Sequence, residues 1–158
     1  MNNKQITYIA LADTDRTALL ALMNHETLRA HLVDHPLFTP ETLEIWVSDK
    51  TEVSAADGCR VRGILIDDKL AGWCGIQPDD DGFELAIVIS SSYWGSGLKV
   101  FRDMIGWARE LGHKEVLFHL LETRRKYRAL EKMAKEVKES ERMARWFSTY
   151  IIPVDING

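Results

Sequence analysis

Apolar residues recur along the chain at two spacings, which together predict ten secondary-structure elements. Six short runs rich in β-branched and aromatic residues predict strands: residues 6–11, 60–66, 70–76, 83–89, 116–121 and 147–154. Four segments with helical spacing or helix-start residues predict helices: those that begin after residues 13–15, at residue 39, at residue 98 and in the charged run from residue 124 onward. The order β-α-α-β-β-β-α-β-α-β indicates an α+β fold with a mixed sheet, and no repeat or linker divides it.

The composition is typical of a folded domain. Of the 158 residues, 46% are hydrophobic and 28% are charged, so residues 1–158 are expected to form a single domain with a substantial core. The net charge of −4 argues against general nucleic-acid binding. No apolar run approaches the roughly 20 residues of a membrane-spanning helix, and no apolar signal core follows the first residues. We therefore expect a cytoplasmic protein with no membrane partner.

The two cysteines are expected to be unpaired. Asp67 and Asp68 separate two strand-like runs and predict a tight hairpin. In that hairpin Cys59 would lie opposite Ile76 rather than opposite Cys74. Two cysteines alone cannot form a disulfide framework or a zinc site, so both are expected to be small buried side chains, and no metal is expected.

Charge is distributed unevenly along the chain. Residues 34–81 contain 11 acidic and 4 basic side chains, whereas residues 123–145 contain 9 basic and 4 acidic ones. A solvated surface is one explanation for this division. The other is a site that holds a polyanion at one end and a cation at the other.

Two glycines lie in the loop between the strand at 83–89 and the helix that follows. Gly95 and Gly97 allow the backbone to approach a ligand closely, and the first turn of a helix offers unpaired N–H groups that favour phosphate. The loop lacks the Gly-Lys-Ser/Thr of a P-loop and the third glycine of the dinucleotide fingerprint. It is either an anion-binding loop of another kind or a tight turn.

The residues around this loop carry the most specific pattern in the chain. Residues 84–89 are ELAIVI, residues 93–97 are YWGSG, and residues 104–112 are MIGWARELG. This segment resembles the acetyl-CoA motif of the GNAT acetyltransferases. It is most similar to the branch that acetylates the N-termini of ribosomal proteins, the RimJ/RimL type, and the helix start at residues 39–41 with Trp46 also matches that branch. The resemblance implies a central mixed, mostly antiparallel, splayed sheet flanked by about four helices.

The resemblance also implies acetyl-CoA as co-substrate. The backbone of the strand would pair with the pantetheine arm, and the N–H groups of the loop would hold the pyrophosphate. Lys99 could add a charge or be solvated, and the aromatic pair before Gly95 could wedge the loop. The residues assigned to the coenzyme in this way are Ile87, Val88, Ile89, Trp94, Gly95, Ser96, Gly97, Leu98, Lys99, Thr123 and Lys126.

Glu84 is the candidate catalytic base, because it matches the family's strand carboxylate. An α-amino group has a reference pKa near 8, so a carboxylate acting directly or through a water molecule would suffice to deprotonate it. The alternative is that Glu84 forms a cross-strand charge pair. Residues 79–81, three aspartates in a predicted turn over 78–82, are expected to be solvated or to steer a cationic substrate.

The candidate general acid departs from the family pattern. Leu130 stands where the family often has a tyrosine, so the usual proton donor to the departing thiolate is missing. Tyr127 lies one helical turn earlier on the same face and is the substitute that we consider, unless its ring packs beside the core. His119 is either an acid or base or a satisfied structural histidine.

These features predict an N-acetyltransferase that moves an acetyl group from acetyl-CoA to a primary amine. The amine, at a protein N-terminus or on a small molecule such as an aminoglycoside or polyamine, would attack the thioester directly in a ternary complex. The alternative is an acyl-CoA-binding regulatory module with little or no activity. A homodimer is left open, and the sequence does not identify the amine.

Overall fold

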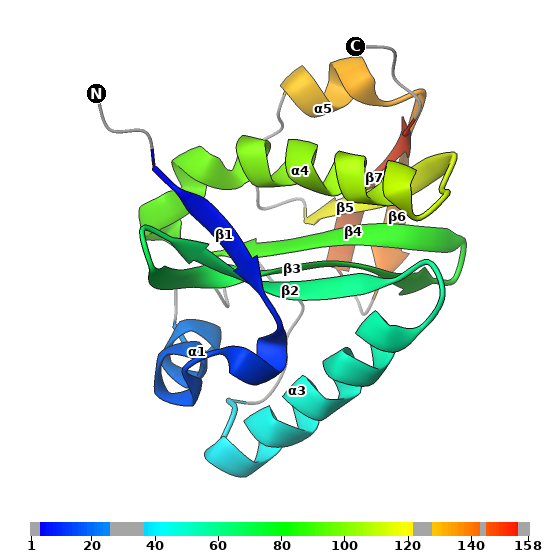
Figure 1. Cartoon of the computed structure of the whole chain (residues 1–158). Helices are drawn as coiled ribbons and strands as arrows, with labels where there is room; N and C mark the ends of the chain where they lie inside the picture. The colour runs from blue at the N-terminus through cyan, green and yellow to red at the C-terminus, as the bar shows by residue number, and fades with distance from the viewer. Residues whose placement is uncertain (1–3, 26–36, 122–127, 143–144, 155–158) are drawn as a thin grey trace.

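Seven strands form one mixed sheet in the computed structural model, which describes residues 4–25, 37–121, 128–142 and 145–154. Their order across the sheet is β1-β2-β3-β4-β5-β7-β6 (Figure 1). Neighbouring strands are antiparallel except β4 and β5, which are parallel. The strands are β1 (Ile6–Ile9), β2 (Arg60–Ile66), β3 (Lys69–Asp79), β4 (Gly82–Ile89), β5 (Glu115–Leu121), β6 (Glu136–Arg142) and β7 (Arg145–Pro153). This confirms the predicted α+β fold with a mostly antiparallel sheet.

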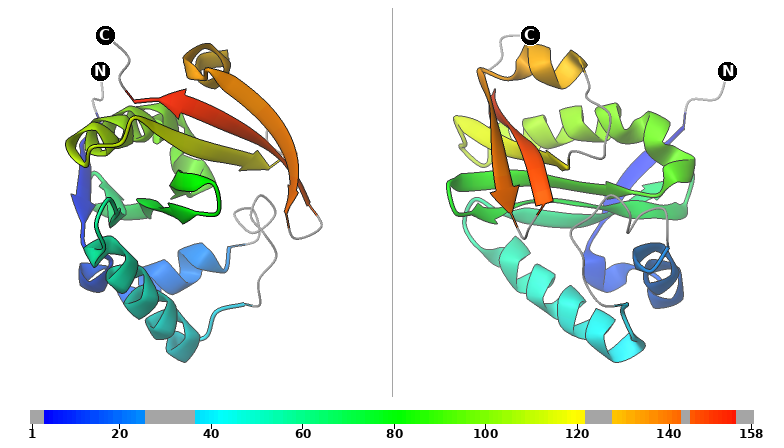
Figure 2. Two further views of the ribbon diagram at one scale, coloured as in Figure 1. Left: turned by 90° about the vertical axis from the view of Figure 1, so that its right-hand side faces the viewer. Right: turned by 180° about the vertical axis from the view of Figure 1, so that it is seen from behind.

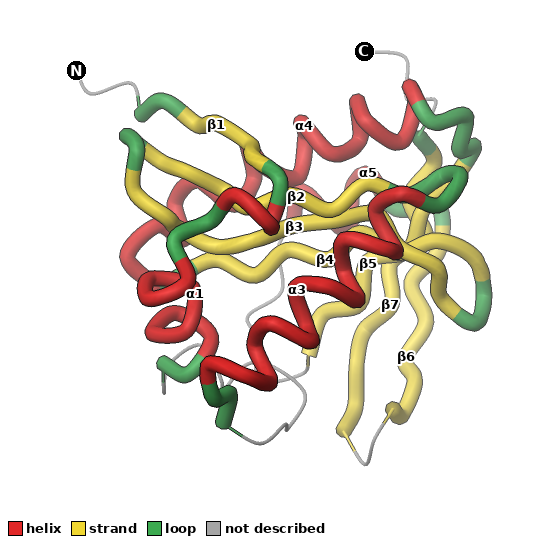
Figure 3. Tube along the Cα trace, turned by 60° about the horizontal axis from the view of Figure 1, so that its bottom comes forward, coloured by secondary structure: helices red, strands yellow, loops and turns green. Residues whose placement is uncertain are grey.

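Four helices in the described part of the chain cover the two faces of the sheet. Helices α1 (Arg16–Met23) and α3 (Pro40–Ala55) lie on one face, which Figure 3 turns toward the viewer. Helices α4 (Gly97–Glu110) and α5 (Arg128–Met133) lie on the other (Figure 1). Each face has its own hydrophobic core. No helix in these described ranges is long and apolar enough to cross a membrane.

The first helices begin where the sequence places capping residues. The Asp15 side chain accepts hydrogen bonds from the backbone N–H groups of Thr17 and Ala18 at the start of α1. Thr39 and Thr42 form a reciprocal capping box at the start of α3, with proline at its first position. These bonds satisfy N–H groups that a helix start leaves unpaired, so both helices begin as predicted.

The hairpin between β2 and β3 corrects one predicted register. Asp67 and Asp68 both have positive φ, 50° and 67°, as a tight two-residue hairpin turn requires. Beyond the turn the register shifts by one residue, so Arg60 rather than Cys59 lies opposite Ile76. The cause is a bulge near Leu65, which sequence pattern does not reveal. The conclusion on the cysteines is unaffected, because both are buried and free.

Strand β6 was not predicted. The charged run from residue 124 onward was expected to be one helix, but in its described part α5 ends at Met133 and Glu136–Arg142 pairs with β7. Val137 is the one apolar residue of β6, and it is 47% exposed. Because β6 lies at the edge of the sheet, charged side chains suit it and protect the edge from pairing with another chain. Residues 124–127 lie outside the described residues.

The two halves of the sheet separate where β4 meets β5. Among the described residues the parallel pairing has one register position, Glu84 opposite Leu117. Past this point β5, β7 and β6 fan away from β4 (Figure 2). The expected splay is therefore present: among the described residues, no register position between β4 and β5 follows Glu84.

Candidate active site

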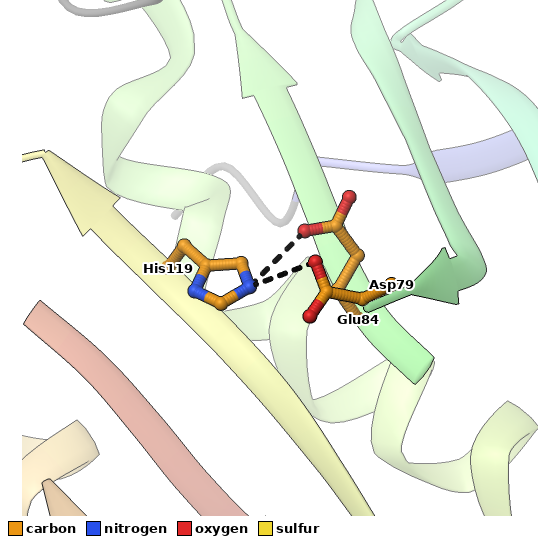
Figure 4. Close-up of side chains that lie close together, drawn as sticks. All are labelled: Asp79, Glu84 and His119. Atoms are coloured by element: carbon orange, nitrogen blue, oxygen red, sulfur yellow. Dashed lines mark hydrogen bonds and ion pairs between the residues drawn. The ribbon is translucent and has the colours of Figure 1, made fainter. Parts of the chain in front are cut away.

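Three polar side chains from three strands meet beside the point where β4 and β5 separate (Figure 4). Nε2 of His119 lies 3.3 Å from Oδ1 of Asp79 and 3.5 Å from Oε2 of Glu84. The side chains are mostly buried: 9% of the His119 side chain, 8% of Asp79 and 21% of Glu84 are exposed to solvent. Two carboxylates and an imidazole in such a place are groups that could accept and hold a proton.

Strand register explains why these residues meet. Residues 80–81 alone turn the chain between β3 and β4, so Gln77 lies opposite Glu84. Residues two apart on a strand share a face, which puts Asp79 beside Gln77. Leu117 is opposite Glu84 on β5, and His119 follows it on the same face. This face of β3 and β4 is the one covered by α1 and α3.

Hydrogen bonds fix the orientation of the histidine and the glutamate. Nδ1 of His119 lies 2.8 Å from Oγ1 of Thr149 on β7. Because carboxylates only accept hydrogen bonds, Nε2 carries the hydrogen that faces Asp79 and Glu84. The other glutamate oxygen, Oε1, accepts a 2.7 Å hydrogen bond from Nε2 of Gln77. Glu84 thus keeps its Oε2 oxygen toward the junction of β4 and β5.

The same three residues form a set of metal-type donors. One atom from each of Asp79, Glu84 and His119 lies within 4.8 Å of the others. An imidazole nitrogen and carboxylate oxygens are ligands that divalent cations use, so the arrangement could hold one. Acid–base chemistry at this site needs only these three side chains.

Three aromatic rings pack on the same face of the sheet as the carboxylates. The rings of Trp46 on α3 and Trp73 on β3 are 5.2 Å apart, edge to face, and Phe38 lies 6.1 Å from Trp46. The ammonium of Lys50 is 5.0 Å from the centre of the Trp73 ring. Aromatic faces attract cations, and here the cation over Trp73 is the ammonium of Lys50.

The loop before α4 leaves space for a ligand beside its two glycines. It forms a short 3-10 helix, η2 (Ser91–Ser96), and the side chain of Ser96 makes no capping hydrogen bond to α4. A Cβ atom added at Gly95 or Gly97 would meet nothing within 4 Å. Packing therefore does not require glycine at either position. The backbone at the start of α4 is accessible to a ligand, as the anion-loop interpretation needs.

The other residues assigned to the coenzyme lie in different surroundings. Val88 and Ile89 have buried side chains on β4, and Ile87 is half-buried, so only the backbone of this stretch could serve a ligand. Leu98 is 41% exposed, and the buried residues of α4 begin at Val100.

Lys99 is engaged within its own helix. Its ammonium lies 2.5 Å from Oδ1 of Asp103, and its side chain is 65% exposed. It would have to leave this surface ion pair to reach a phosphate, which costs little. Three further candidates, Thr123, Lys126 and Tyr127, lie outside the described residues, and Trp94 is described for its backbone alone, within η2.

Sequence reasoning missed several of the residues that surround Glu84. Asp79 was expected in a solvated turn, but it ends β3 and its side chain is nearly buried beside His119. Gln77 was overlooked, although a polar residue on an otherwise apolar strand, opposite Glu84 in a tight hairpin, could have signalled it. No local pattern marks Lys50 or Thr149. On β3 the cross-strand neighbour of Glu84 is the amide of Gln77, and on β5 its Oε2 oxygen lies 3.5 Å from His119. The base and the cross-strand charge pair both stay predictions.

Comparisons with known proteins agree with this fold. None of the curated proteins matches the chain. Spermidine N-acetyltransferase from Vibrio cholerae, solved with CoA and spermine, is 16% identical with a TM-score of 0.68, covering 94% of this chain and 96% of its own. A putative acetyltransferase from Salmonella typhimurium, solved with its cofactor acetyl-CoA, is 15% identical with a TM-score of 0.63, covering 99% and 97%. An N-acetyltransferase from Staphylococcus aureus is 11% identical with a TM-score of 0.68, covering 98% and 100%.

These solved structures show the likeness of the fold, and a family model shows the family. The model described as the acetyltransferase (GNAT) family matches residues 20–135, which is more than half of the chain. The chain therefore belongs to the GNAT family of acetyltransferases.

Proposed function

We propose that residues 1–158 act as one domain that transfers the acetyl group of acetyl-CoA to a primary amine, with Glu84 as the base. The observation that carries this proposal is the position of Glu84. Its carboxylate lies at the last paired position before β4 and β5 separate, and its Oε2 oxygen faces the junction. A thioester laid along β4 beyond Glu84 would pass this oxygen.

The reaction would proceed by direct attack in a ternary complex. Glu84 takes a proton from the ammonium, either directly or through one water molecule. The lone pair of the neutral amine then forms the N–C bond to the thioester carbonyl. The nitrogen of the tetrahedral intermediate gives its second proton to solvent, and collapse of the intermediate breaks the C–S bond and releases the thiolate of coenzyme A. Backbone N–H groups of β4 beyond Glu84 would stabilise the oxyanion of that intermediate.

The coenzyme would lie along β4 beyond Glu84 and at the start of α4. Amides of its pantetheine arm would pair with the backbone from Ile87 to Ile89, and its pyrophosphate would accept hydrogen bonds from the N–H groups that follow Gly95. Two solved structures of similar fold, from Vibrio cholerae and Salmonella typhimurium, were determined with CoA or acetyl-CoA, which supports acetyl-CoA as the co-substrate.

Replacing Gly97 with valine tests the coenzyme loop. The added side chain meets no protein atom at its Cβ, so the fold should persist, but it would occupy space over the helix start that the pyrophosphate needs. We expect the affinity for CoA, measured by calorimetry, to fall about tenfold or more, which is roughly 1.4 kcal/mol. Gly106→Val is the matched control, since Gly106 lies in the same helix and also has no neighbour within 4 Å of an added Cβ. Unchanged CoA affinity in Gly97→Val would mean that the loop is only a turn.

The proton that the thiolate needs is assigned to Tyr127 from the sequence. We expect Tyr127→Phe to lower kcat by roughly ten- to a hundredfold, the low end of general acid catalysis, with little change in CoA affinity. Steady-state kinetics and calorimetry on the same preparation measure both. A kcat within about twofold of the parent would assign the proton to water or to His119.

The acceptor is proposed to be a protein N-terminus, as in the RimJ/RimL branch, on the strength of the motifs in residues 84–112. The carboxylates also suit a small amine, and a protein of similar fold is a spermidine N-acetyltransferase. A screen of acetyl-CoA consumption over peptides and small amines separates these classes. If no amine supports turnover while CoA binds, the chain is an acyl-CoA-binding module and the proposal is wrong.

A further inference from the structure

We propose that Lys50 of α3 is a positioning residue, which acts through the side-chain amide of Gln77 to hold Glu84 in the orientation of an active base. The proposal rests on the function proposed above. Neither Lys50 nor Gln77 belongs to the coenzyme loop or to the family pattern. Lys50 lies 27 positions before its partner Gln77 in the chain, and Gln77 lies 7 positions before its partner Glu84.

A continuous chain of hydrogen bonds connects the three residues. Nζ of Lys50 donates to Oε1 of Gln77 at 2.6 Å, and Nε2 of Gln77 donates to Oε1 of Glu84 at 2.7 Å. An ammonium group can only donate hydrogen bonds, so it determines which end of the amide faces it. The carbonyl of Gln77 must point to Lys50, and its NH2 group must then point to Glu84.

This orientation matters because a free amide could also be turned the other way. With its carbonyl toward Glu84, Gln77 would place two acceptors face to face and would repel the ionised carboxylate. With its NH2 toward Glu84, it donates to Oε1 and holds the carboxylate in one orientation. The second oxygen, Oε2, remains directed at the acceptor side and at His119.

Lys50 itself is fixed in place by its surroundings. Its ammonium lies 5.0 Å from the centre of the Trp73 ring, and Trp73 is 6% exposed and packs edge to face on Trp46. Burial lowers the pKa of Lys50, while the Glu84 carboxylate and then Asp49 act in the opposite direction. The Glu84 carboxylate therefore acts electrostatically on Lys50, although the amide of Gln77 lies between them.

The test compares Lys50→Met and Gln77→Met with the parent enzyme. Both substitutions keep side-chain length and remove the donor chain. We expect kcat to fall about tenfold, with CoA affinity and thermal stability nearly unchanged. Lys69→Met, which removes an exposed lysine at the start of β3, is the control and should leave all of these measurements unchanged.

Lys50→Arg provides the rescue and a second readout. Arginine still only donates, so we expect it to restore at least half of the lost kcat if its longer side chain reaches Gln77. Because the pKa of Lys50 is lowered, Lys50 in the parent should lose its proton at a lower pH than an ordinary lysine does. The activity of the parent should therefore begin to fall at that lower pH. Arginine stays protonated, so this loss should be absent in Lys50→Arg, whereas titration of the acceptor amine affects both enzymes equally.

Double variants separate this proposal from the function on which it rests. If Lys50 acts through Glu84, adding Lys50→Met to Glu84→Gln should lower kcat no further. A tenfold loss that persists in the Glu84→Gln background would overturn the positioning role. So would an unchanged kcat and pH profile in both methionine variants, and in that case a large effect of Glu84→Gln would leave the proposed function standing. If Glu84→Gln itself has no effect, the proposed function fails instead.

Discussion

Glu84→Gln should lower kcat by roughly a hundred- to ten-thousandfold, which is the range of general base catalysis. The substitution keeps the shape of the side chain, and the bond from Gln77 can still be made to the amide oxygen. What is lost is the carboxylate that takes the proton of the amine. Affinity for CoA, measured by calorimetry, should stay within about twofold of the parent, because the coenzyme is proposed to use backbone groups.

The pH dependence of the loss distinguishes a base from a structural group. An α-amino acceptor has a reference pKa near 8, so a growing fraction is already deprotonated as the pH rises. The deficit of Glu84→Gln should therefore be largest near neutral pH and should shrink partly above pH 8. Glu115→Gln, at an exposed position on β5, is the control. An equal loss at every pH would show that Glu84 serves the fold and not the proton transfer.

Gly72→Ala should be the most destabilising single-methyl substitution in the described sheet. A Cβ at Gly72 would lie 1.9 Å from the carbonyl oxygen of Val88 and 2.9 Å from Cα of Ile89. Both are backbone atoms of β4, so relief requires the strands to move apart. We expect a loss of about 3–5 kcal/mol in the free energy of unfolding, and a fall in Tm of roughly 2–4 °C for each kcal/mol.

The matched control is Gly106→Ala in the middle of α4. An added Cβ there meets nothing within 4 Å, and alanine favours a helix over glycine by about 0.5–1 kcal/mol. This variant should therefore be slightly more stable than the parent in chemical denaturation. Because Val88 and Ile89 belong to the proposed coenzyme edge, Gly72→Ala should also weaken CoA binding in whatever fraction remains folded. A stable Gly72→Ala with normal CoA affinity would contradict the close approach of β3 and β4.

Local signals in the sequence predicted the elements that are determined locally. Thr39 begins a helix because its hydroxyl caps it, and Asp67 and Asp68 form a turn because aspartate tolerates positive φ. The position of Glu84 on a strand and that of Gly97 at a helix start also followed from local pattern. These predictions need only a few neighbouring residues.

The features that sequence reasoning missed depend on residues far apart in the chain. Strand β6 has the composition of a charged helix, and its pairing with β7 makes it a strand. Asp79 was read as part of a solvated turn because the register that places it beside His119 is a property of three strands together. Lys50 reaches Gln77 only because α3 lies across that part of the sheet. Contacts of this kind leave no periodic trace in either segment.

The single register position between β4 and β5 also bears on how the molecule opens and closes. Strands β1 to β4 and strands β5 to β7 are each held by extended antiparallel ladders, while between the halves the cohesion comes chiefly from side chains such as Leu85, Val116 and Tyr150 in their common core. Two such halves are natural units of partial unfolding, able to separate at a lower free energy than either needs to come apart. A coenzyme lying along β4 would add contacts at this junction, so the two halves should separate at a higher free energy in the loaded protein than in the empty one.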